Sequence, residues 1–458
     1  MREVDVVVVG AGPAGEVCAG RLADAGLEVV VVERELVGGE CSYWACMPSK
    51  ALLRAPGLLA EVERVPGAAQ AVTGALDVQA VLDRRDEVVH DVDDAAQLPW
   101  LEDKGIGLVR GAARFTGERE LQVGDEALRA RQAVVVATGS LAAIPPVEGL
   151  REARPWTNRE ATTAKQVPAR LAIIGGGVVA VEMAQAYAAF GSQVHMLVRE
   201  DRLLEREEPF VCQQVADGLR DAGVHLDFET SATRVERRAD GTVHLELEGH
   251  HGTLDVDEVL VATGRTPRTD DLGLEALGLE PGGYLRTDDQ LRVAGHDWLY
   301  AIGDVNGRQL LTHMGKYQAR VAADVIRGRD VRLRPVTSDA PPPRVVFTEP
   351  QVAAVGHTLE SAKAAGLDVR HADVGTGANA GGSFVGKDAP GTSRLVVERG
   401  SDVVVGATFT GAEVQELLHA ATIAVTSGLT VEELWHATPA FPTRNELWLN
   451  LVEALEAG

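Results

Sequence analysis

Residues 38–50 read GGECSYWACMPSK and contain two cysteines, Cys41 and Cys46, that are five positions apart. Such a pair can close as a disulfide only if the backbone bends between them, because the two Cα atoms must approach within about 7 Å. The glycines before Cys41 permit a tight entry into the segment. If Pro48 lies in the helix that the pair opens, it should distort that helix, because proline has no amide hydrogen and crowds the preceding turn. We therefore expect a redox-active pair, with Lys50 as a nearby cation.

Three other interpretations of the pair are a structural disulfide, two unrelated buried thiols and half of a zinc site. A structural disulfide is disfavoured in a large cytosolic chain. Zinc would need two further ligands at ordinary spacing, and the remaining cysteines of the sequence are Cys18 and Cys212. Cys18 is better explained as a small buried side chain. Cysteine count and context therefore favour the catalytic interpretation.

Length and charge limit the possible functions. The chain has 458 residues, 45% of them hydrophobic, so it can bury several cores and typical domain sizes suggest about three domains. Its 44 basic and 68 acidic residues give a formal charge of −24, which argues against nucleic acid or an anionic membrane as the natural partner. Because we find no apolar run long enough to span a bilayer, we expect a cytoplasmic protein.

Residues 4–33 form the first recognisable nucleotide-binding pattern. A valine-rich strand leads into a turn with Gly10, Gly12 and Gly15, followed by an Ala-rich helix and a second strand that ends at Glu33. The glycines let the backbone approach a pyrophosphate at the positive end of the helix, and the acid can accept hydrogen bonds from ribose hydroxyls. Strand, turn, helix, strand and terminal acid at this spacing predict a dinucleotide site.

A second unit of the same kind begins at Leu171. Gly175, Gly177 and Ala180 follow its first strand, and its second strand ends at Arg199. Two such units predict two dinucleotides. An arginine in the place of the usual ribose-binding acid suits a 2′-phosphate, so we favour NADPH, although the neighbouring acids Glu200 and Glu205 weaken this preference and leave NADH possible.

These motifs, in this order, resemble the FAD-dependent pyridine nucleotide-disulfide oxidoreductases of class I, which include dihydrolipoyl dehydrogenase, glutathione reductase and mercuric reductase. The resemblance runs over nearly the whole chain. It implies an α/β fold with two Rossmann-like domains and a C-terminal α+β dimerisation domain. The expected segments are 1–145 and 266–335 for FAD, 146–265 for NAD(P), and 336–458 for the interface. Residues 51–100 are expected to form amphipathic helices that pack on the FAD-binding domain.

The resemblance also implies roles for individual residues. Cys46 would be the sulfur next to the flavin and Cys41 the outward-facing interchange thiol, while Lys50 and Glu182 would form an ion pair beside the reactive flavin edge. Tyr43 and Trp44 suggest an altered pocket, or else simple packing. Ten residues are expected to hold FAD: Gly10, Gly12, Gly15, Glu33, Gly39, Thr138, Gly139, Gly264, Asp304 and Thr312. Four are expected to hold NADPH: Gly175, Gly177, Ala180 and Arg199.

The C-terminal stretch departs from this family pattern. Lipoyl and glutathione enzymes carry a His-Pro-Thr-x-x-Glu dyad, whose histidine exchanges protons with the cysteines of the other subunit of a homodimer. Here the stretch reads FPTRNE from Phe441 to Glu446, so Phe441 takes the place of the histidine. An alignment through His436 needs a shifted spacing and finds no acid at Thr443. Because a leaving thiolate must be protonated, loss of the base should cost roughly 10²–10⁴-fold in rate, and we expect poor turnover of lipoamide or glutathione disulfide.

The sequence therefore predicts a homodimeric flavoenzyme that passes hydride from NADPH through FAD to the Cys41–Cys46 disulfide and on to an unidentified small acceptor. One alternative is direct reduction of quinones or other small acceptors by the flavin. Another is C–S cleavage like that of 2-ketopropyl-coenzyme M oxidoreductase/carboxylase, which also has phenylalanine at the base position. Mercuric reductase is disfavoured because no vicinal cysteine pair follows Cys212. A redox-sensing binding protein is disfavoured by the intact second nucleotide motif.

Overall fold

The structure is a computed structural model that describes residues 1–248, 252–334, 340–387, 389 and 391–457. The chain folds as two compact units. Unit 1 comprises Met1–Pro48, Arg85–Ala143 and Gly264–Arg334, and unit 2 comprises Ser49–Arg84, Ile144–Thr263 and Pro335–Gly458. Among the described residues, no helix combines the length and the apolar character that crossing a bilayer requires. The four segment boundaries given above stay a prediction.

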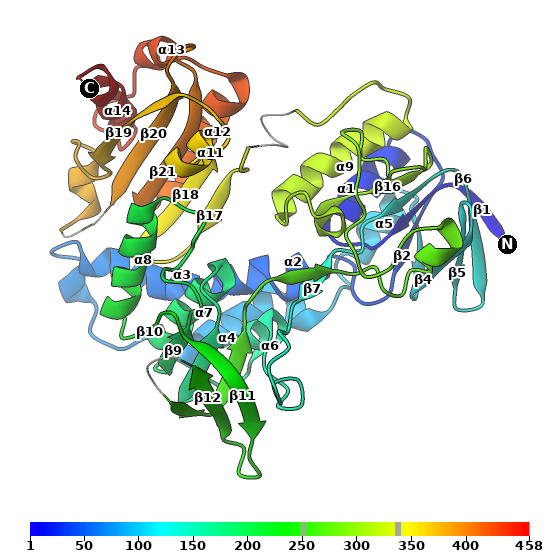
Figure 1. The fold of residues 1–458 in the computed structure, drawn as a ribbon, viewed down its shortest axis with the longest axis horizontal. Helices are drawn as coiled ribbons and strands as arrows, with labels where there is room; N and C mark the ends of the chain where they lie inside the picture. The colour runs from blue at the N-terminus through cyan, green and yellow to red at the C-terminus, as the bar shows by residue number, and fades with distance from the viewer. Residues whose placement is uncertain (249–251, 335–339, 388, 390, 458) are drawn as a thin grey trace. The chain divides into compact units, whose positions relative to one another are not determined.

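Unit 1 is built on a seven-stranded sheet (Figure 1). Its parallel part runs in the order β3-β2-β1-β6-β16, and an antiparallel hairpin extends the other end of β6. The valines of β1 are almost entirely buried, as expected for a parallel strand that is covered on both faces. The strands are β1 (Arg2–Val9), β2 (Val29–Glu33), β3 (Gly107–Arg110), β4 (Ala113–Gly117), β5 (Glu120–Val123), β6 (Glu126–Val136) and β16 (Leu299–Ala301).

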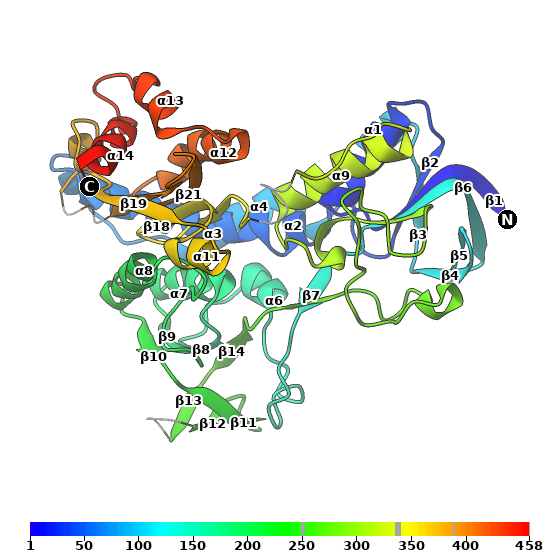
Figure 2. The same ribbon diagram turned by 45° about the horizontal axis from the view of Figure 1, so that its top comes forward.

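Helices α1 (Pro13–Ala23) and α9 (Thr312–Ile326) pack side by side in unit 1, as Figures 1 and 2 both show. Small buried residues such as Ala19 and Ala322 allow this close approach, and Cys18 is fully buried in the same core, as expected. The remaining elements of unit 1 are α2 (Gly39–Tyr43), η2 (His90–Val92), α5 (Leu98–Asp103), β7 (Ser140–Ala142), β15 (Arg265–Pro267), η3 (Leu274–Leu277) and η4 (Gly303–Asn306).

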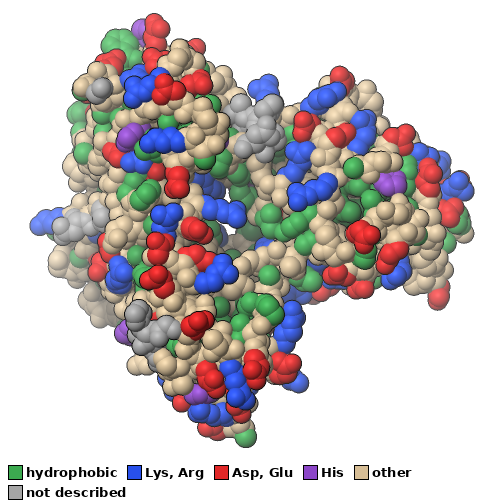
Figure 3. Space-filling view, in the orientation of Figure 1, with side chains coloured by type: hydrophobic (Ala, Val, Ile, Leu, Met, Phe, Trp, Pro, Cys, Tyr) green, Lys and Arg blue, Asp and Glu red, His purple; other side chains and the backbone are tan. Residues whose placement is uncertain are grey.

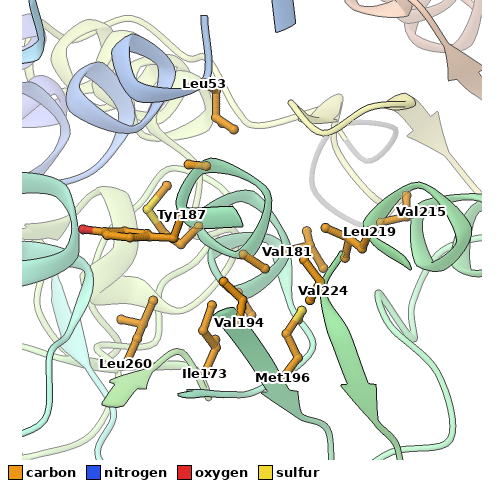
Figure 4. Close-up of a cluster of buried hydrophobic side chains, with 14 of the residues drawn as sticks. Leu53, Ile173, Val181, Tyr187, Val194, Met196, Val215, Leu219, Val224 and Leu260 are labelled. Carbon is orange, nitrogen blue, oxygen red and sulfur yellow. The ribbon is translucent and has the colours of Figure 1, made fainter. Parts of the chain in front are cut away.

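Unit 2 contains a second parallel sheet, in the order β10-β9-β8-β14. Helix α7 follows the second glycine turn and contributes to a core in which Val181 and Tyr187 meet Ile173 and Leu260 of the sheet (Figure 4). A three-stranded antiparallel sheet packs on another core of the same unit. These elements are α6 (Asn158–Thr163), β8 (Arg170–Ile174), α7 (Val178–Ala189), β9 (Gln193–Leu197), α8 (Pro209–Asp221), β10 (His225–Asp227), β11 (Ser231–Arg237), β12 (Val243–Glu248), β13 (Thr253–Val256) and β14 (Glu258–Val261).

Two helices within residues 51–100 differ from the expectation, whereas Leu98 and Trp100 of α5 pack in the core of unit 1 as expected. Helix α3 (Cys46–Glu63) places Leu52 and Leu53 in the core of unit 2, and α4 (Val78–Val88) adds Val81 and Leu82, whereas they were expected to pack on the FAD-binding domain. The short segment η1 (Ala69–Ala71) lies between the two helices. Periodicity identifies an apolar face but does not say which sheet or helix it covers.

The C-terminal part of unit 2 contains a five-stranded antiparallel sheet in the order β17-β18-β21-β20-β19. Its core joins strand residues such as Phe409 to Trp448 and Leu451 of the last helix. The elements are β17 (Arg344–Val346), β18 (Gln351–Gly356), α11 (Leu359–Ala364), β19 (Val369–Gly375), η5 (Gly382–Val385), β20 (Thr392–Glu398), β21 (Val404–Gly411), η6 (Val414–Leu417), α12 (Leu418–Ser427), α13 (Val431–His436) and α14 (Glu446–Ala457).

Charged side chains of both signs are interspersed over the face of the molecule that Figure 3 shows. The net charge of −24 is therefore not gathered into one acidic field on this face.

Candidate functional site

In the first glycine turn, the backbone has room only for glycine at Gly10 and Gly15, whereas Gly12 has open space beside it. Gly10 has φ +106°, and a Cβ on it would lie 2.4 Å from the carbonyl oxygen of Ala137. A Cβ on Gly15 would lie 2.0 Å from the oxygen of Gly10. Gly12, by contrast, precedes α1 with an ordinary φ of −71° and meets nothing within 4 Å. Its missing side chain leaves the positive end of α1 open to a ligand, as a pyrophosphate site requires.

Glu33 ends β2 and is held beside this turn. The backbone N–H of Ala11 donates to its Oε2 at 2.7 Å, and the N–H of Glu35 donates to its Oε1 at 2.8 Å. The carboxylate is buried with a fixed orientation, and each oxygen keeps a lone pair for a further donor. This geometry fits the predicted hydrogen bonds to ribose.

One cavity of unit 1 brings most of the predicted FAD residues together with one of the cysteines. Its lining includes Gly10, Gly12, Glu33, Gly39, Cys41, Thr138, Gly139, Asp304 and Thr312. Gly15 supports the turn from behind, and Gly264 accepts a hydrogen bond from the N–H of Ala143 at 2.9 Å. An open helix end, a buried ribose-type acid and a lining that includes both the nucleotide turn and Cys41 fit FAD.

Asp304 is linked to two residues that the sequence did not identify as functional. The hydroxyl of Ser140 donates to its Oδ2 at 2.5 Å, and the Arg265 guanidinium donates to that hydroxyl at 2.6 Å. Burial raises the pKa of the Asp304 carboxyl, while these two neighbours act in the opposite direction. Ser140 and Arg265 each directly follow a strand that leads into Thr-Gly, and this shared pattern was the available signal.

Arg268 is another residue of the cavity lining that the sequence did not identify. Its guanidinium pairs with Glu35 at 3.2 Å and with Glu40, the residue before Cys41, at 3.0 Å. The Arg268 carbonyl also accepts a hydrogen bond from the Thr138 hydroxyl at 2.8 Å. An acid beside a predicted cysteine pair calls for a counter-charge, but the partner is 228 positions away and no local pattern indicates it.

The two cysteines lie in two consecutive helices. Cys41 is in α2, Cys46 opens α3, and the chain bends at Trp44. Pro48 does not distort the helix, because it lies in the first turn, where an amide hydrogen has no intrahelical partner. The expectation of a proline distortion was therefore wrong, and the bend precedes the proline.

Both cysteines are free thiols in this structure. The Sγ of Cys46 lies 3.3 Å from the Thr312 hydroxyl oxygen. A hydrogen bond with Cys46 and burial raise the pKa of the Cys41 thiol, while Thr312 and the positive charge of Lys316 lower it. The thiols of the reduced pair therefore lie within hydrogen-bonding reach of each other.

Tyr43, between the cysteines, is a packing residue. It is buried, its hydroxyl donates to the carbonyl of Val37 at 3.0 Å, and its ring meets that of Trp44 edge-on. Packing therefore explains Tyr43 better than an altered pocket does.

The second glycine turn, in unit 2, resembles the first: one glycine is required by a close backbone neighbour and another leaves the start of a helix open. A Cβ on Gly175 would lie 2.5 Å from the Ala262 oxygen, whereas Gly177 precedes α7 and meets nothing within 4 Å. Ala180 is completely buried in α7. Arg199 follows β9 with an exposed side chain, and its Nη2 lies 2.7 Å from Glu200 Oε1. The turn is open to a second dinucleotide, and the arginine can reach solvent beside it.

Lys50 and Glu182 form an ion pair within unit 2. Lys50 Nζ lies 2.7 Å from Glu182 Oε2, and the other carboxylate oxygen accepts the backbone N–H of Phe347 at 3.0 Å. The ammonium group also lies 4.9 Å from the centre of the Phe347 ring. The predicted pair exists, and its role toward the flavin stays a prediction.

The C-terminal stretch that differs from the family's histidine-containing pattern presents an exposed aromatic ring, Phe441, and a carboxylate, Glu446. Phe441 is 77% exposed, and Glu446 opens α14. Within the described part of the chain, Glu446 Oε2 is buried and has no hydrogen-bond partner. The assignment of Phe441 to the histidine position stays a prediction.

Comparisons with known proteins agree with this architecture. Residues 4–323 match the pyridine nucleotide-disulphide oxidoreductase family, and residues 342–452 match the dimerisation domain of that family. The chain is 32% identical to dihydrolipoyl dehydrogenase of Bacillus subtilis over 461 residues, covering 98% of this chain and 96% of the relative. It is 30% identical to mercuric reductase of Staphylococcus aureus over 451 residues, covering 97% and 81%.

A solved structure resembles the whole chain as well. The Cu(II) complex of the HOCl-induced flavoprotein disulfide reductase RclA from Escherichia coli superimposes with a TM-score of 0.87 at 25% identity, over 99% of each chain. The predicted fold class is confirmed: Rossmann-like FAD and NAD(P) domains with a C-terminal dimerisation domain. The chain therefore belongs to the pyridine nucleotide-disulphide oxidoreductase family, whose members are FAD-dependent oxidoreductases that use NAD(P)H.

Proposed function

We propose that this protein is an NADPH-dependent flavoprotein disulfide reductase that works through Cys41 and Cys46 without a histidine base. The observation that carries the proposal is the cavity of unit 1, which is lined by the glycine turn, Glu33, Thr312 and Cys41. Cys41 lines the same cavity as the nucleotide cradle, and Cys46 lies 3.3 Å from Thr312, another lining residue, so electrons can pass between a nucleotide bound there and the cysteine pair. Bound there, FAD would accept hydride from the nicotinamide and pass two electrons to the disulfide.

The chain's own residues then have separable roles. Reduction breaks the Cys41–Cys46 bond and takes up two electrons, leaving one thiolate at Cys46, where the Thr312 hydroxyl can donate a hydrogen bond to it. The proton that comes with the hydride leaves Cys41 as a thiol; Cys41 gives this proton to solvent, and its sulfur attacks the acceptor disulfide, forming a mixed disulfide and expelling one thiolate. Cys46 then attacks Cys41, re-forms the internal disulfide and expels the second thiolate. The two expelled thiolates take up protons to become thiols, so each turnover consumes the hydride of one NADPH and, in sum, one proton from solvent.

NADPH is the proposed donor because Arg199 follows β9 at the ribose end of the second nucleotide unit. Its guanidinium is exposed, so it can turn from Glu200 toward a 2′-phosphate at small cost. The Lys50–Glu182 pair is proposed to orient the nicotinamide and the flavin N5. A homodimer is proposed because residues 342–452 match the family's dimerisation domain.

A second candidate acceptor is Cu(II). A structural relative, RclA, was solved as a Cu(II) complex, and the reduced Cys41–Cys46 pair offers two neighbouring thiols, a ligand type that favours copper in its lower oxidation state. Reduction of two Cu(II) ions would consume the two electrons of one NADPH.

Steady-state turnover with a panel of acceptors tests the proposal. FAD-loaded protein is assayed with NADPH and with disulfides, quinones or Cu(II), alongside Cys41→Ser and Cys46→Ser. Loss of at least 100-fold of disulfide turnover in both variants supports the proposal. Quinone turnover that survives both substitutions, with no disulfide or Cu(II) turnover in the wild type, would replace it with direct reduction by the flavin.

A further inference from the structure

Glu16 carries a carboxyl group that the disulfide exchange described above does not use. It lies in the first turn of α1, where its backbone N–H donates to the carbonyl of Gly12 at 3.0 Å. Its side chain is half-buried, and in the part of the chain that the structure describes the carboxylate makes no hydrogen bond and no ion pair. Burial without such partners disfavours the charged form of an acid. An acid of this kind is a candidate for proton transfer.

The first turn of α1 lies against the first turn of α2, which carries Cys41. A Cβ on Gly39, the first residue of α2, would lie 2.9 Å from the Cα of Gly12 and 3.5 Å from its backbone nitrogen. Cys41 follows Gly39 by two residues, and Glu16 follows Gly12 by four. Because one helical turn spans about 3.6 residues, both side chains belong to the turns that meet at this contact.

Helix α9 reaches the same place from a distant part of the chain. At its first residue, the Thr312 hydroxyl oxygen lies 3.3 Å from the Sγ of Cys46. Three residues later, a Cβ on Gly315 would lie 3.3 Å from the Cβ of Ala14, so α9 also touches the first turn of α1, beside which it runs in Figures 1 and 2. The starts of α1, α2, α3 and α9 thus converge around the cysteine pair.

Charged and titratable groups act on Glu16 from three neighbouring elements. Burial raises the pKa of its carboxyl to about 7, the ammonium group of Lys316 on α9 opposes this rise, and the carboxylate of Glu33 on β2 adds to it. On α2, the charge of Glu16 in turn raises the pKa of the Tyr43 hydroxyl. Lys316 also lowers the pKa of the Cys41 thiol. Because charge interactions fade with distance, one ammonium group that acts on both the carboxyl and the thiol places them near each other.

We propose that Glu16 is the acid–base residue of the cysteine pair: its carboxylate takes the proton of Cys41, and its carboxyl then gives that proton to the first thiolate that leaves the acceptor. The proposal rests on the function proposed above, in which Cys41 is the interchange thiol. A group that titrates near the operating pH can serve as base and as acid in one cycle. Such a group would supply proton transfer in a chain that has Phe441 at the predicted histidine position.

Only the route of one proton differs from the exchange described above. The reduced pair holds a thiolate at Cys46 and a thiol at Cys41, and Glu16 instead of solvent takes the Cys41 proton. The Cys41 sulfur attacks the acceptor disulfide, one S–S bond forms as another breaks, and the Glu16 carboxyl protonates the expelled thiolate. Cys46 then attacks Cys41, and the second thiolate takes its proton from solvent. Each turnover still consumes one NADPH and one solvent proton, and Glu16 ends the cycle as a carboxylate.

The test compares two uncharged disulfides whose leaving thiols differ in acidity. Bis(2-hydroxyethyl) disulfide expels a weakly acidic alkyl thiol, which gains much from a proton donor, whereas 4,4′-dithiodipyridine expels an acidic thiol, which gains little. kcat/KM for each disulfide with NADPH is measured across neutral pH in the FAD-loaded wild type and in Glu16→Gln. The control is Glu102→Gln, which removes an exposed carboxylate of α5 in the same unit.

We expect Glu16→Gln to lower kcat/KM for the alkyl disulfide by about 100-fold and that for the pyridyl disulfide by about tenfold or less, so their ratio falls about tenfold or more. In the wild type, kcat/KM for the alkyl disulfide should rise with pH through an inflection near 7, because the carboxylate is the form that takes the proton. In Glu16→Gln this rise should move to higher pH, since Cys41 must then lose its proton unaided. The control should keep the wild-type ratio and inflection.

A ratio within twofold of the wild-type value in Glu16→Gln, or an inflection that stays in place, would overturn the inference and leave the disulfide reductase assignment standing. Reduction of the bound flavin by NADPH at the wild-type rate shows that the variant is folded. The wild-type profile also decides by itself, because a profile without an inflection near pH 7 would overturn the inference whether or not the variant folds. If the wild type reduces neither disulfide although NADPH reduces its flavin, the proposed function fails and the role of Glu16 fails with it.

Discussion

The Sγ of Cys46 and the hydroxyl oxygen of Thr312 lie 3.3 Å apart although 266 positions separate them in the chain. Thr312 opens α9, so both the hydroxyl and the positive end of that helix are directed to the sulfur that is proposed to lie next to the flavin. A thiolate at Cys46 is therefore stabilised by a hydrogen bond and by a helix end, and neither depends on a histidine.

Removing this hydrogen bond should weaken the thiolate form of the reduced enzyme. Thr312→Val deletes the donor with little change in volume, and a hydrogen bond to a charged group contributes about 1.5–3 kcal/mol. We expect the long-wavelength thiolate-to-flavin absorbance of the two-electron-reduced enzyme to fall at neutral pH and to return at higher pH. Thr312→Ser keeps the hydroxyl and should keep the band, and equal spectra for both variants would contradict the assignment.

Removing Lys50 should lower the free energy of unfolding more than removing the charge of Glu182. The Glu182 side chain is 3% exposed and the Lys50 side chain 35% exposed, so an unpaired carboxylate stays buried while an unpaired ammonium can reach water. We expect Lys50→Met to lower the free energy of unfolding by about 1–3 kcal/mol, and Glu182→Gln to cost less because the amide oxygen can still accept the Phe347 N–H. Thermal unfolding of the two variants measures this order, and the reverse order would refute it.

Glu16 should make stability depend on pH. Burial raises the pKa of its carboxyl from 4.5 to about 7, so between these values the folded protein binds more protons than the unfolded chain. The contribution of this group to stability is present below about pH 4.5 and is lost as the pH rises toward 7, by up to about 3 kcal/mol. Glu16→Gln removes this dependence. Its gain in melting temperature over wild type should therefore be larger at pH 8 than at pH 5, and an equal difference at both values would show that the carboxyl is not buried in this way.

Coenzyme preference should depend on Arg199. Arg199→Gln removes the charge proposed to meet the 2′-phosphate, and we expect KM for NADPH to rise about tenfold or more while KM for NADH changes little. Arg220→Gln, on α8 beside Asp217, is the matched control and should change neither value. A parallel change with both coenzymes would indicate a structural role for Arg199.

Restoring a histidine should recover the family's proton chemistry if the alignment at the C-terminus is correct. Glu446 Oε2 is buried and, among described residues, has no hydrogen-bond partner, so it can accept from an imidazole placed at position 441. We expect Phe441→His to raise lipoamide or glutathione disulfide turnover by roughly 10–100-fold. Adding Glu446→Gln should remove most of that gain, and turnover that stays at the wild-type level in Phe441→His would argue for another alignment.

Local patterns predicted much of the fold and the nucleotide sites. Gly10 and Gly175 have positive φ and a close backbone neighbour, so only glycine fits there. Turns of this kind can therefore be predicted from the positions of their glycines. Glu33 likewise ends its strand where the pattern places it. The cysteine pair was found because five-residue spacing is itself informative, and the bend that it requires lies between the two helices.

What the sequence did not show depends on partners distant in the chain. The Arg268–Glu40 pair and the Ser140–Asp304 bond join residues 228 and 164 positions apart, and neither end has a pattern that specifies the other. The helices within 51–100 have a clear apolar face, yet the sheet that it covers depends on the chain path. Pro48 was misjudged because its effect depends on where the helix begins, and helix ends are the least certain feature of a sequence-based prediction.

Anaerobic titration of the FAD-loaded protein with NADPH tests the central claim most directly. If Cys41 and Cys46 form a redox-active disulfide in electronic contact with FAD, the enzyme takes up four electrons per subunit, and a long-wavelength thiolate-to-flavin band appears after the first two. Uptake of only two electrons, with full bleaching of the flavin and no such band, would contradict the account.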